Sequence, residues 1–203
     1  LEAIEIDSDN QIYQSIDGIV YDKSRTKVLY CPKGFKGEVI IPDGVTSIGQ
    51  DAFRSCSKLE TIHIPKSVTT IETDAFVYSG LKSVVIPESV ETIGWYAFEN
   101  SGLKSVVIPG SVKHINRGTF QDCKELKKVI IKDGVKTIQE FAFKNCTSLT
   151  DITIPASVTD IPAGQDNDYG VVNAFYGCKN ITVHCQEGSY AAHRNLYGYG
   201  SGY

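Results

Sequence analysis

Residues 41–65 read IPDGVTSIGQDAFRSCSKLETIHIP, and the next two stretches repeat the same apolar columns. Residues 64–87 read IPKSVTTIETDAFVYSGLKSVVIP and residues 86–109 read IPESVETIGWYAFENSGLKSVVIP, so the period is 22 or 23 residues. A period of this size is typical of a solenoid. One unit of this length cannot bury its own apolar face, so each unit must be stabilised by stacking on the next.

Each unit divides into three parts. Leu59, Ile62 and Ile64 predict a short strand with one face inward, which the following proline ends because proline has no N–H to donate. A valine and an isoleucine three residues apart, first seen as Val45 and Ile48, predict a second, shorter extended segment. An alanine–phenylalanine pair then predicts a single helical or 3-10 turn with the ring in the interior. The phenylalanines are Phe53, Phe76, Phe98, Phe120, Phe143 and Phe175.

Four cysteines occupy one column of the repeat, three residues after the phenylalanine. They are Cys56, Cys123, Cys146 and Cys178. A shared column indicates small buried side chains rather than a cluster of ligands, and the sequence has no C-x-x-C or matched histidine pair. A disulfide between Cys123 and Cys146, on adjacent turns, and a metal site are the alternatives. Cys31 and Cys185 lie outside the column, and their redox state is left open.

The repeat predicts one continuous domain over residues 1–203. Its expected parts are an N-terminal capping repeat (1–40), five regular repeats (41–160), and an atypical last repeat with a C-terminal cap (161–203). Terminal units of a stack are expected to depart from the pattern because one of their faces meets solvent.

The two ends carry their own signals. Leu1, Ile4 and Ile6 predict a first strand, and residues 18–30 predict a hairpin around a polar turn. The last repeat is nine residues longer between Ile161 and Phe175, which predicts a loop at residues 164–172. Beyond it, a short capping helix is expected at residues 189–194, followed by a glycine-tyrosine tail over residues 197–203.

The columns IPxxVxxIGxxAFxxCxxLxxIxIP resemble the leucine-rich repeats of the BspA type. The opening segment and the closing Gly188-Ser189-Tyr190-Ala191 resemble the ends of that family. The resemblance implies an α/β solenoid: a right-handed superhelix with a parallel sheet on one face, and short extended segments and helical or 3-10 turns on the others. It also implies bacterial surface or secreted proteins, with adhesion or ligand binding and no catalytic motif. Lys132, where proline is expected, departs from the pattern.

Composition excludes some partners. The net charge of -4 and the pI of about 5.6 give no basic field for nucleic acid or an anionic membrane. Apolar runs of three or four residues fall far short of the roughly 20 that cross a bilayer, so no membrane insertion by this segment is expected. Because the chain contains no methionine, we expect it to be excised from a larger extracellular or cell-surface protein. A monomer is favoured, and the oligomeric state is left open.

The residue before the last isoleucine of each strand should point outward. This row is Ile40, His63, Val85, Val107, Ile130 and Thr153. It predicts an exposed apolar ladder, because a solenoid has nothing to cover this face of a parallel sheet. Either these β-branched residues simply suit strands, or they form a docking strip.

Three places earlier lies a row that is rich in lysine. It contains Gly37, Glu60, Lys82, Lys104, Lys127 and Thr150, with Lys128 beside it. One interpretation is a solvated positive face. The other is a basic track that accepts an acidic peptide or a sulfated or sialylated glycan.

No other pattern predicts chemistry. Asp166, Asn167 and Asp168 could offer oxygens to calcium, but a complete loop needs further ligands in register. No nucleotide, metalloprotease or hydrolase motif is present, so no cofactor, metal or catalytic residue is predicted. An enzyme would need an unexpected cleft near residues 166–169. The sequence therefore predicts a non-enzymatic module that binds a host or bacterial surface protein or glycan, or alternatively a spacer that presents another domain.

Overall fold

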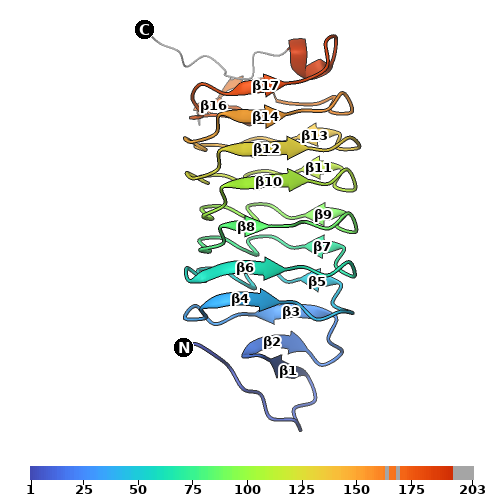
Figure 1. The fold of residues 1–203 in the computed structure, drawn as a ribbon, viewed down its shortest axis with the longest axis vertical. Coiled ribbons are helices and arrows are strands. Elements are labelled where there is room, and N and C mark those ends of the chain that lie inside the picture. Colours follow the sequence, from blue (N-terminus) through green and yellow to red (C-terminus); the bar gives the residue numbers. More distant parts are fainter. Residues whose placement is uncertain (163–164, 168–169, 194–203) are drawn as a thin grey trace.

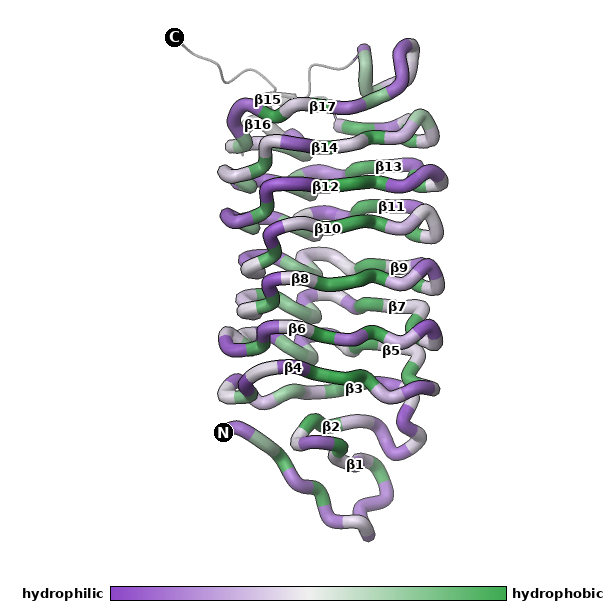
Figure 2. The backbone as a smooth tube through the Cα atoms, in the orientation of Figure 1, coloured by the Kyte–Doolittle hydropathy of each residue, from purple (hydrophilic) through white to green (hydrophobic). Residues whose placement is uncertain are grey.

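The chain winds into a stack of similar turns (Figure 1). The structure, a computed structural model, describes residues 1–162, 165–167 and 170–193. Segments of apolar residues recur at equivalent places in successive turns (Figure 2), as the repeat predicts. The predicted solenoid is therefore confirmed, with parallel pairing between turns. It is a β-solenoid rather than an α/β one, because the described elements are strands except for one short 3-10 helix.

Each turn contributes one strand to a first row of parallel strands. These are β4 (Gly37–Ile40), β6 (Leu59–His63), β8 (Ser83–Val84), β10 (Ser105–Ile108), β12 (Lys128–Ile131), β14 (Asp151–Thr153) and β17 (Thr182–His184). They form two sheets, β4-β6-β8 and β10-β12-β14-β17. Where Lys132 replaces proline, its backbone N–H donates to the Ile108 carbonyl at 2.9 Å, so this strand end gains a bond that proline would remove.

A second row of shorter strands runs behind the first, as predicted from the valine–isoleucine pairs. It consists of β5 (Ser47–Ile48), β7 (Thr70–Ile71), β9 (Thr92–Ile93), β11 (His114–Ile115) and β13 (Thr137–Ile138). The first three continue the sheet of the N-terminal hairpin, and β11 pairs with β13. The inward valines and isoleucines of these segments are buried.

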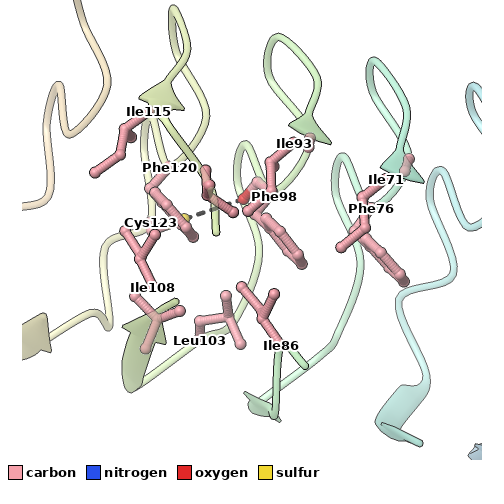
Figure 3. Close-up of a cluster of buried hydrophobic side chains, with 14 of the residues drawn as sticks. Ile71, Phe76, Ile86, Ile93, Phe98, Leu103, Ile108, Ile115, Phe120 and Cys123 are labelled. Atoms are coloured by element: carbon pink, nitrogen blue, oxygen red, sulfur yellow. Dashed lines mark hydrogen bonds between the residues drawn. The ribbon is translucent and has the colours of Figure 1, made fainter. Parts of the chain in front are cut away.

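The repeat phenylalanines stack in one internal row (Figure 3). From Phe53 to Phe175, neighbouring ring centroids lie 5.1–5.4 Å apart and ring planes differ by 4–6°. This is the centroid range in which offset stacked aromatic rings attract each other. The predicted interior position of the phenylalanines is confirmed.

The cysteine column lies beside this row and consists of free thiols. Cys123 donates to the Phe98 carbonyl oxygen at 3.1 Å (Figure 3), and Cys146 and Cys178 make the equivalent bonds one and two repeats later. Burial raises the pKa of the Cys123 thiol to about 11, which keeps its proton available for this bond. All six cysteines are free, so the Cys123–Cys146 disulfide is not formed.

The alanine–phenylalanine segments are turns rather than helices, which corrects the prediction. In the first of them, Asp51 (φ 57°) and Ser55 (φ 62°) have left-handed backbones on either side of Ala52 and Phe53. The N–H of Phe53 donates across to the Ala75 carbonyl of the next repeat at 2.8 Å. A helix would direct this bond to its own preceding turn, so the bonding between repeats replaces helical bonding.

Both strand rows are interrupted at the same level of the stack, between β8 and β10 and between β9 and β11. In neighbouring repeats, a backbone N–H just after the second-row strand donates to the preceding repeat, as Gly94 does to Ile71 and Gln139 to Ile115. At the interruption, the side-chain amide of Asn116 donates to the Ile93 carbonyl at 2.7 Å instead. A side chain therefore joins the two halves of the stack at this point.

Asn116→Ala is expected to lower the free energy of unfolding by about 1–3 kcal/mol, because the Ile93 carbonyl loses its donor. Denaturant titration followed by circular dichroism measures this loss. Gln139→Ala is the control, since the backbone N–H of Gln139 makes the equivalent bond and survives the change. It removes only an exposed side-chain bond, from the Arg117 N–H at 3.1 Å, so its loss should be smaller. Equal losses in the two variants would contradict the role given to the Asn116 amide.

The N-terminal end differs partly from the prediction. The hairpin is confirmed as β2 (Ile19–Asp22) and β3 (Lys27–Tyr30), with β1 (Tyr13–Ile16) added antiparallel to β2. The strand predicted from Leu1, Ile4 and Ile6 is not formed, and Leu1 is 82% exposed. This segment makes isolated backbone bonds, such as that from Ile4 to the Gly18 carbonyl, instead of a ladder.

At the C-terminal end, the predicted loop contains an antiparallel hairpin, β15 (Gln165–Asn167) with β16 (Gly170–Val172). The capping helix is confirmed as the 3-10 helix η1 (Tyr190–His193). Gly164, Asp168 of the calcium hypothesis and the glycine-tyrosine tail lie outside the described residues.

Candidate binding surface

The outward side of the first strand row, here called the strand face, carries the two predicted rows. Pairing places Ile40 beside His63, and Val107 beside Ile130. The exposed fractions are 68% for Ile40, 81% for Val85 and 42% for Val107; His63 is exposed and Ile130 is half-buried. The predicted apolar ladder is therefore present and open to solvent. Its role in binding stays a prediction.

The lysine row is also formed. Backbone bonds join Lys104 to the Lys82 carbonyl at 3.2 Å and Lys127 to the Lys104 carbonyl at 2.9 Å. Lys82, Lys104, Lys127 and Lys128 are exposed, and none of them makes an ion pair with another described residue. Gly37 departs from the prediction, because a bulge at Gly37/Glu38 pairs it with Leu59 instead of Glu60.

The acidic groups beside the histidines of this face are engaged. The Glu38 carboxylate lies 2.6 Å from His63 Nε2. At the other end, a hydrogen bond from the Thr150 hydroxyl, and then one with His184, hold the pKa of Asp151 below its usual value. His184 pairs with Thr153 and extends the outward row beyond the predicted residues.

The middle of the strand face therefore combines unpaired positive charge with exposed apolar side chains. Lys82, Lys104 and Lys127 lie just before β8, β10 and β12. Val85, Val107 and Ile130 come three residues after them, Val85 just past the end of β8 and the other two within their strands. Neighbouring strands of a sheet lie about 4.8 Å apart. At this distance two unit charges repel each other by only about 1 kcal/mol in water, so the lysine row costs little. An acidic partner would lower this repulsion while covering the valines.

The structure adds a second surface that the sequence did not predict. A groove of about 540 Å³, here called the turn groove, opens where the chain leaves the second strand row. It is lined by Trp95, Tyr96, Arg117, Ile138, Gln139, Glu140, Asp160 and Pro162. Trp95, Arg117 and Glu140 occupy one column of three successive repeats, two residues after the second-row isoleucine.

Arg117 organises the turn groove. Its Nε donates to the Tyr96 hydroxyl at 3.2 Å and its Nη1 to Glu140 Oε2 at 3.1 Å. Its guanidinium lies over the Phe141 ring, 5.1 Å from the centroid, in the range of a cation–π contact. The Arg117 backbone N–H also donates to the Gln139 side chain at 3.1 Å, so both ends of the residue are fixed.

The described residues offer neither a membrane span nor a metal cluster. They contain no helix long and apolar enough to span a bilayer. They also contain no group of three or more histidine, cysteine, aspartate or glutamate side chains arranged to hold a metal ion.

Solved structures of bacterial leucine-rich repeat proteins are similar to this chain. A protein from Eubacterium ventriosum is 24% identical with a TM-score of 0.71, and the match covers 90% of this chain and 54% of that one. The pneumococcal vaccine antigen PcpA is 17% identical with a TM-score of 0.71, covering 92% and 50%. The T. pallidum leucine-rich repeat protein is 36% identical with a TM-score of 0.56, covering 63% and 62%.

The first two of these similarities support the fold alone, and this chain spans about half the length of those two proteins. No curated protein matches the sequence. Residues 46–182 match, as six copies, the family described as the BspA type leucine rich repeat region. With its repeat columns, its internal phenylalanine row and this match over most of its length, the chain belongs to the BspA-type leucine-rich repeat family.

Proposed function

We propose that this chain is a non-enzymatic recognition module whose strand face binds an extended acidic segment of a partner protein. Leucine-rich repeat proteins are generally interaction or adhesion scaffolds and generally not enzymes. The proposal depends on two features that occur together. Val85 is 81% exposed, and the nearby row of lysines makes no ion pairs among the described residues. The net charge of the chain is -4, so this basic strip is a local feature of an acidic molecule.

The apolar ladder favours a peptide over a sulfated or sialylated glycan. An anionic glycan would neutralise Lys82, Lys104 and Lys127 but would leave Val85 and Val107 without apolar partners. An extended segment that alternates acidic and aliphatic residues can supply both kinds of contact. If it runs between the two rows, its acidic side chains project towards the lysines and its aliphatic side chains towards the valines. We place the module in a bacterial surface or secreted protein, with a host or bacterial surface protein as the partner.

Replacing Lys82, Lys104 and Lys127 together by alanine is expected to weaken peptide binding about 3- to 150-fold. Each exposed charge pair is worth about 0.2–1 kcal/mol, and about 1.4 kcal/mol is a factor of ten in affinity. The probe is a fluorescent peptide of alternating glutamate and leucine, measured by anisotropy at low and at high salt. Wild-type binding should weaken with salt, because the contact charges are exposed.

The matched control removes three other exposed lysines, Lys66, Lys113 and Lys136, which lie outside the lysine row. This variant has the same net charge as the test variant, so equal losses in both would show a general charge effect and reject the strand face. Val107→Glu should also weaken binding, because it adds a like charge at the ladder. If the chain binds heparin but not the peptide, the ligand of the strand face is an anionic glycan and the peptide proposal is rejected. If it binds neither, the chain is a spacer that presents another domain.

A further inference from the structure

The turn groove has the size and composition of a ligand site. Its volume of about 540 Å³ lies within the roughly 300–1,000 Å³ that is usual for small-molecule sites. Its residues lie in or just after β9, β11 and β13, except Asp160 and Pro162, which belong to the next repeat. The groove therefore needs none of the residues of the proposed peptide site. Trp95, which lines this groove, is 57% exposed, although large aromatic residues are usually buried.

The aromatic residues here occupy backbone positions that are unfavourable for them. In the turns, the residue before the alanine or threonine is left-handed: Asp51 and Asp74 in two repeats and Gly118 in another. These residue types tolerate a positive φ, whereas bulky side chains do so at an energetic cost. Yet Tyr96 (φ 54°) and Phe141 (φ 58°) stand in this column on either side of Gly118. Their presence indicates that the rings serve the surface rather than the turn.

Gly118 makes room for one of these rings. A Cβ atom added at Gly118 would lie 2.2 Å from Cε1 of Tyr96. The Tyr96 ring therefore lies against a bare backbone, and Arg117 holds its hydroxyl at 3.2 Å. Trp95 and Tyr96 are therefore consecutive aromatic residues of which Trp95 is exposed and Tyr96 is held in place by Arg117.

The polar groups at the groove select against ions. The charge of Arg117 is matched by its bond to Glu140, and Asp160 adds a negative charge, so the three sum to -1. A negative sum disfavours anionic ligands, and a quaternary ammonium ligand would leave the Gln139 and Trp95 N–H donors without acceptors. The Asp160 carboxylate, the Gln139 amide N–H groups and the Trp95 indole N–H make no hydrogen bond within the described part of the chain.

We propose that the turn groove binds a neutral saccharide. A sugar ring has an apolar C–H face that packs on an aromatic ring, and hydroxyl groups at its edge that both donate and accept hydrogen bonds. Trp95 and Tyr96 provide the aromatic surface. Asp160 accepts from hydroxyl groups, and Gln139 and the Trp95 indole donate to them. The ligand is therefore uncharged, unlike the acidic partner of the strand face.

The test uses the single tryptophan of the chain, Trp95, as its own reporter. The intact chain is titrated with maltotriose, cellotriose and chitotriose while the emission of Trp95 is recorded. A saturable change in intensity or wavelength with at least one of them is expected. Calorimetry with that sugar should then show about tenfold weaker binding for Trp95→Ala, because the exposed platform is lost.

Tyr78→Ala is the matched control, since Tyr78 is also an exposed aromatic residue with a left-handed backbone and does not line the groove. Its affinity for the sugar should be unchanged, as should that of the triple lysine variant. The proposal fails if no neutral sugar changes the emission, or if Trp95→Ala binds as well as the wild type. It also fails if only sialyllactose, or only tetramethylammonium, produces a saturable change. None of these outcomes bears on the peptide site.

Discussion

Phe98→Ala is expected to lower the free energy of unfolding by about 3–5 kcal/mol, the usual range for a large aromatic side chain removed from a core. The Phe98 ring is fully buried and lies 5.1 Å from the Phe76 ring and 5.4 Å from the Phe120 ring. Truncation opens a cavity and also removes both stacking contacts, each worth about 0.5–1.5 kcal/mol beyond the burial of area. Urea titration followed by circular dichroism measures the loss.

A second effect is expected on the neighbouring repeats. The main chain of Phe98 bonds to the next repeat through the Cys123 thiol and the Thr119 carbonyl, and alanine keeps these bonds, so the coupling that is lost is the ring stacking on Phe76 and Phe120. Each repeat is stabilised mainly by its neighbours, so a weak repeat in the middle lowers the coupling between the two halves. The emission of Trp95, three residues away, should therefore report a transition at lower denaturant than circular dichroism does.

Phe53→Ala is the control, because Phe53 is equally buried but begins the row, with its stacking contact to Phe76 on one side. It should lose less stability than Phe98→Ala and keep the two transitions together. A loss below about 1 kcal/mol at Phe98 would be inconsistent with a packed internal row.

The repeat columns made the core predictable from the sequence. A residue type that recurs every 22 or 23 positions, such as the phenylalanine of Phe53 and Phe76, must meet its equivalents in the stack, so burial and stacking follow from periodicity. The outward ladder was predictable for the same reason, because alternation along a strand fixes which residue faces out. Ile40 and Val85 are exposed accordingly.

The turn groove could not be predicted in this way, because its residues differ from repeat to repeat. Trp95, Arg117 and Glu140 share one column but no chemical type, and a search for conserved columns passes over them. A signal was nevertheless present. Tyr96 and Phe141 stand where aspartate or glycine stands in other repeats, and an unsuitable residue at a turn position indicates a local function.

The predictions of a helical turn and of a first strand were wrong because they rested on local patterns alone. An alanine–phenylalanine pair is compatible with a helix, but the left-handed residues Asp51 and Ser55 and the bonding between repeats impose consecutive hydrogen-bonded turns. The apolar residues Leu1, Ile4 and Ile6 suited a strand, but β1 and not this segment pairs with β2. Pairing between distant segments decides both cases, and short-range patterns do not contain it.

Gly80→Ala is expected to lower the free energy of unfolding by about 3 kcal/mol, at the upper end of the usual effect of overpacking. A Cβ atom at Gly80 would lie 2.1 Å from the carbonyl oxygen of Ser57 and 2.7 Å from its carbonyl carbon. Both are backbone atoms of the preceding turn, so no side chain can rotate away. The two turns must separate, which would strain the 3.0 Å bond from the Gly80 N–H to the Cys56 carbonyl.

Gly102→Ala is the matched control, one repeat later in the same column, four residues after the phenylalanine. There the nearest atom to an added Cβ is the Gly80 carbonyl oxygen at 3.4 Å, and the backbone is outside the left-handed region. Alanine fits such a site and restricts the unfolded chain, so stability should stay the same or rise by about 0.4–1 kcal/mol. The two sites differ in the turn of the preceding repeat against which the glycine packs. Gly80 packs against the longer turn that contains Cys56, whereas Gly102 packs against the short turn that contains Gly80. Thermal melts of the two variants in parallel measure the difference, and equal melting temperatures would show that the close contact at Ser57 is not made.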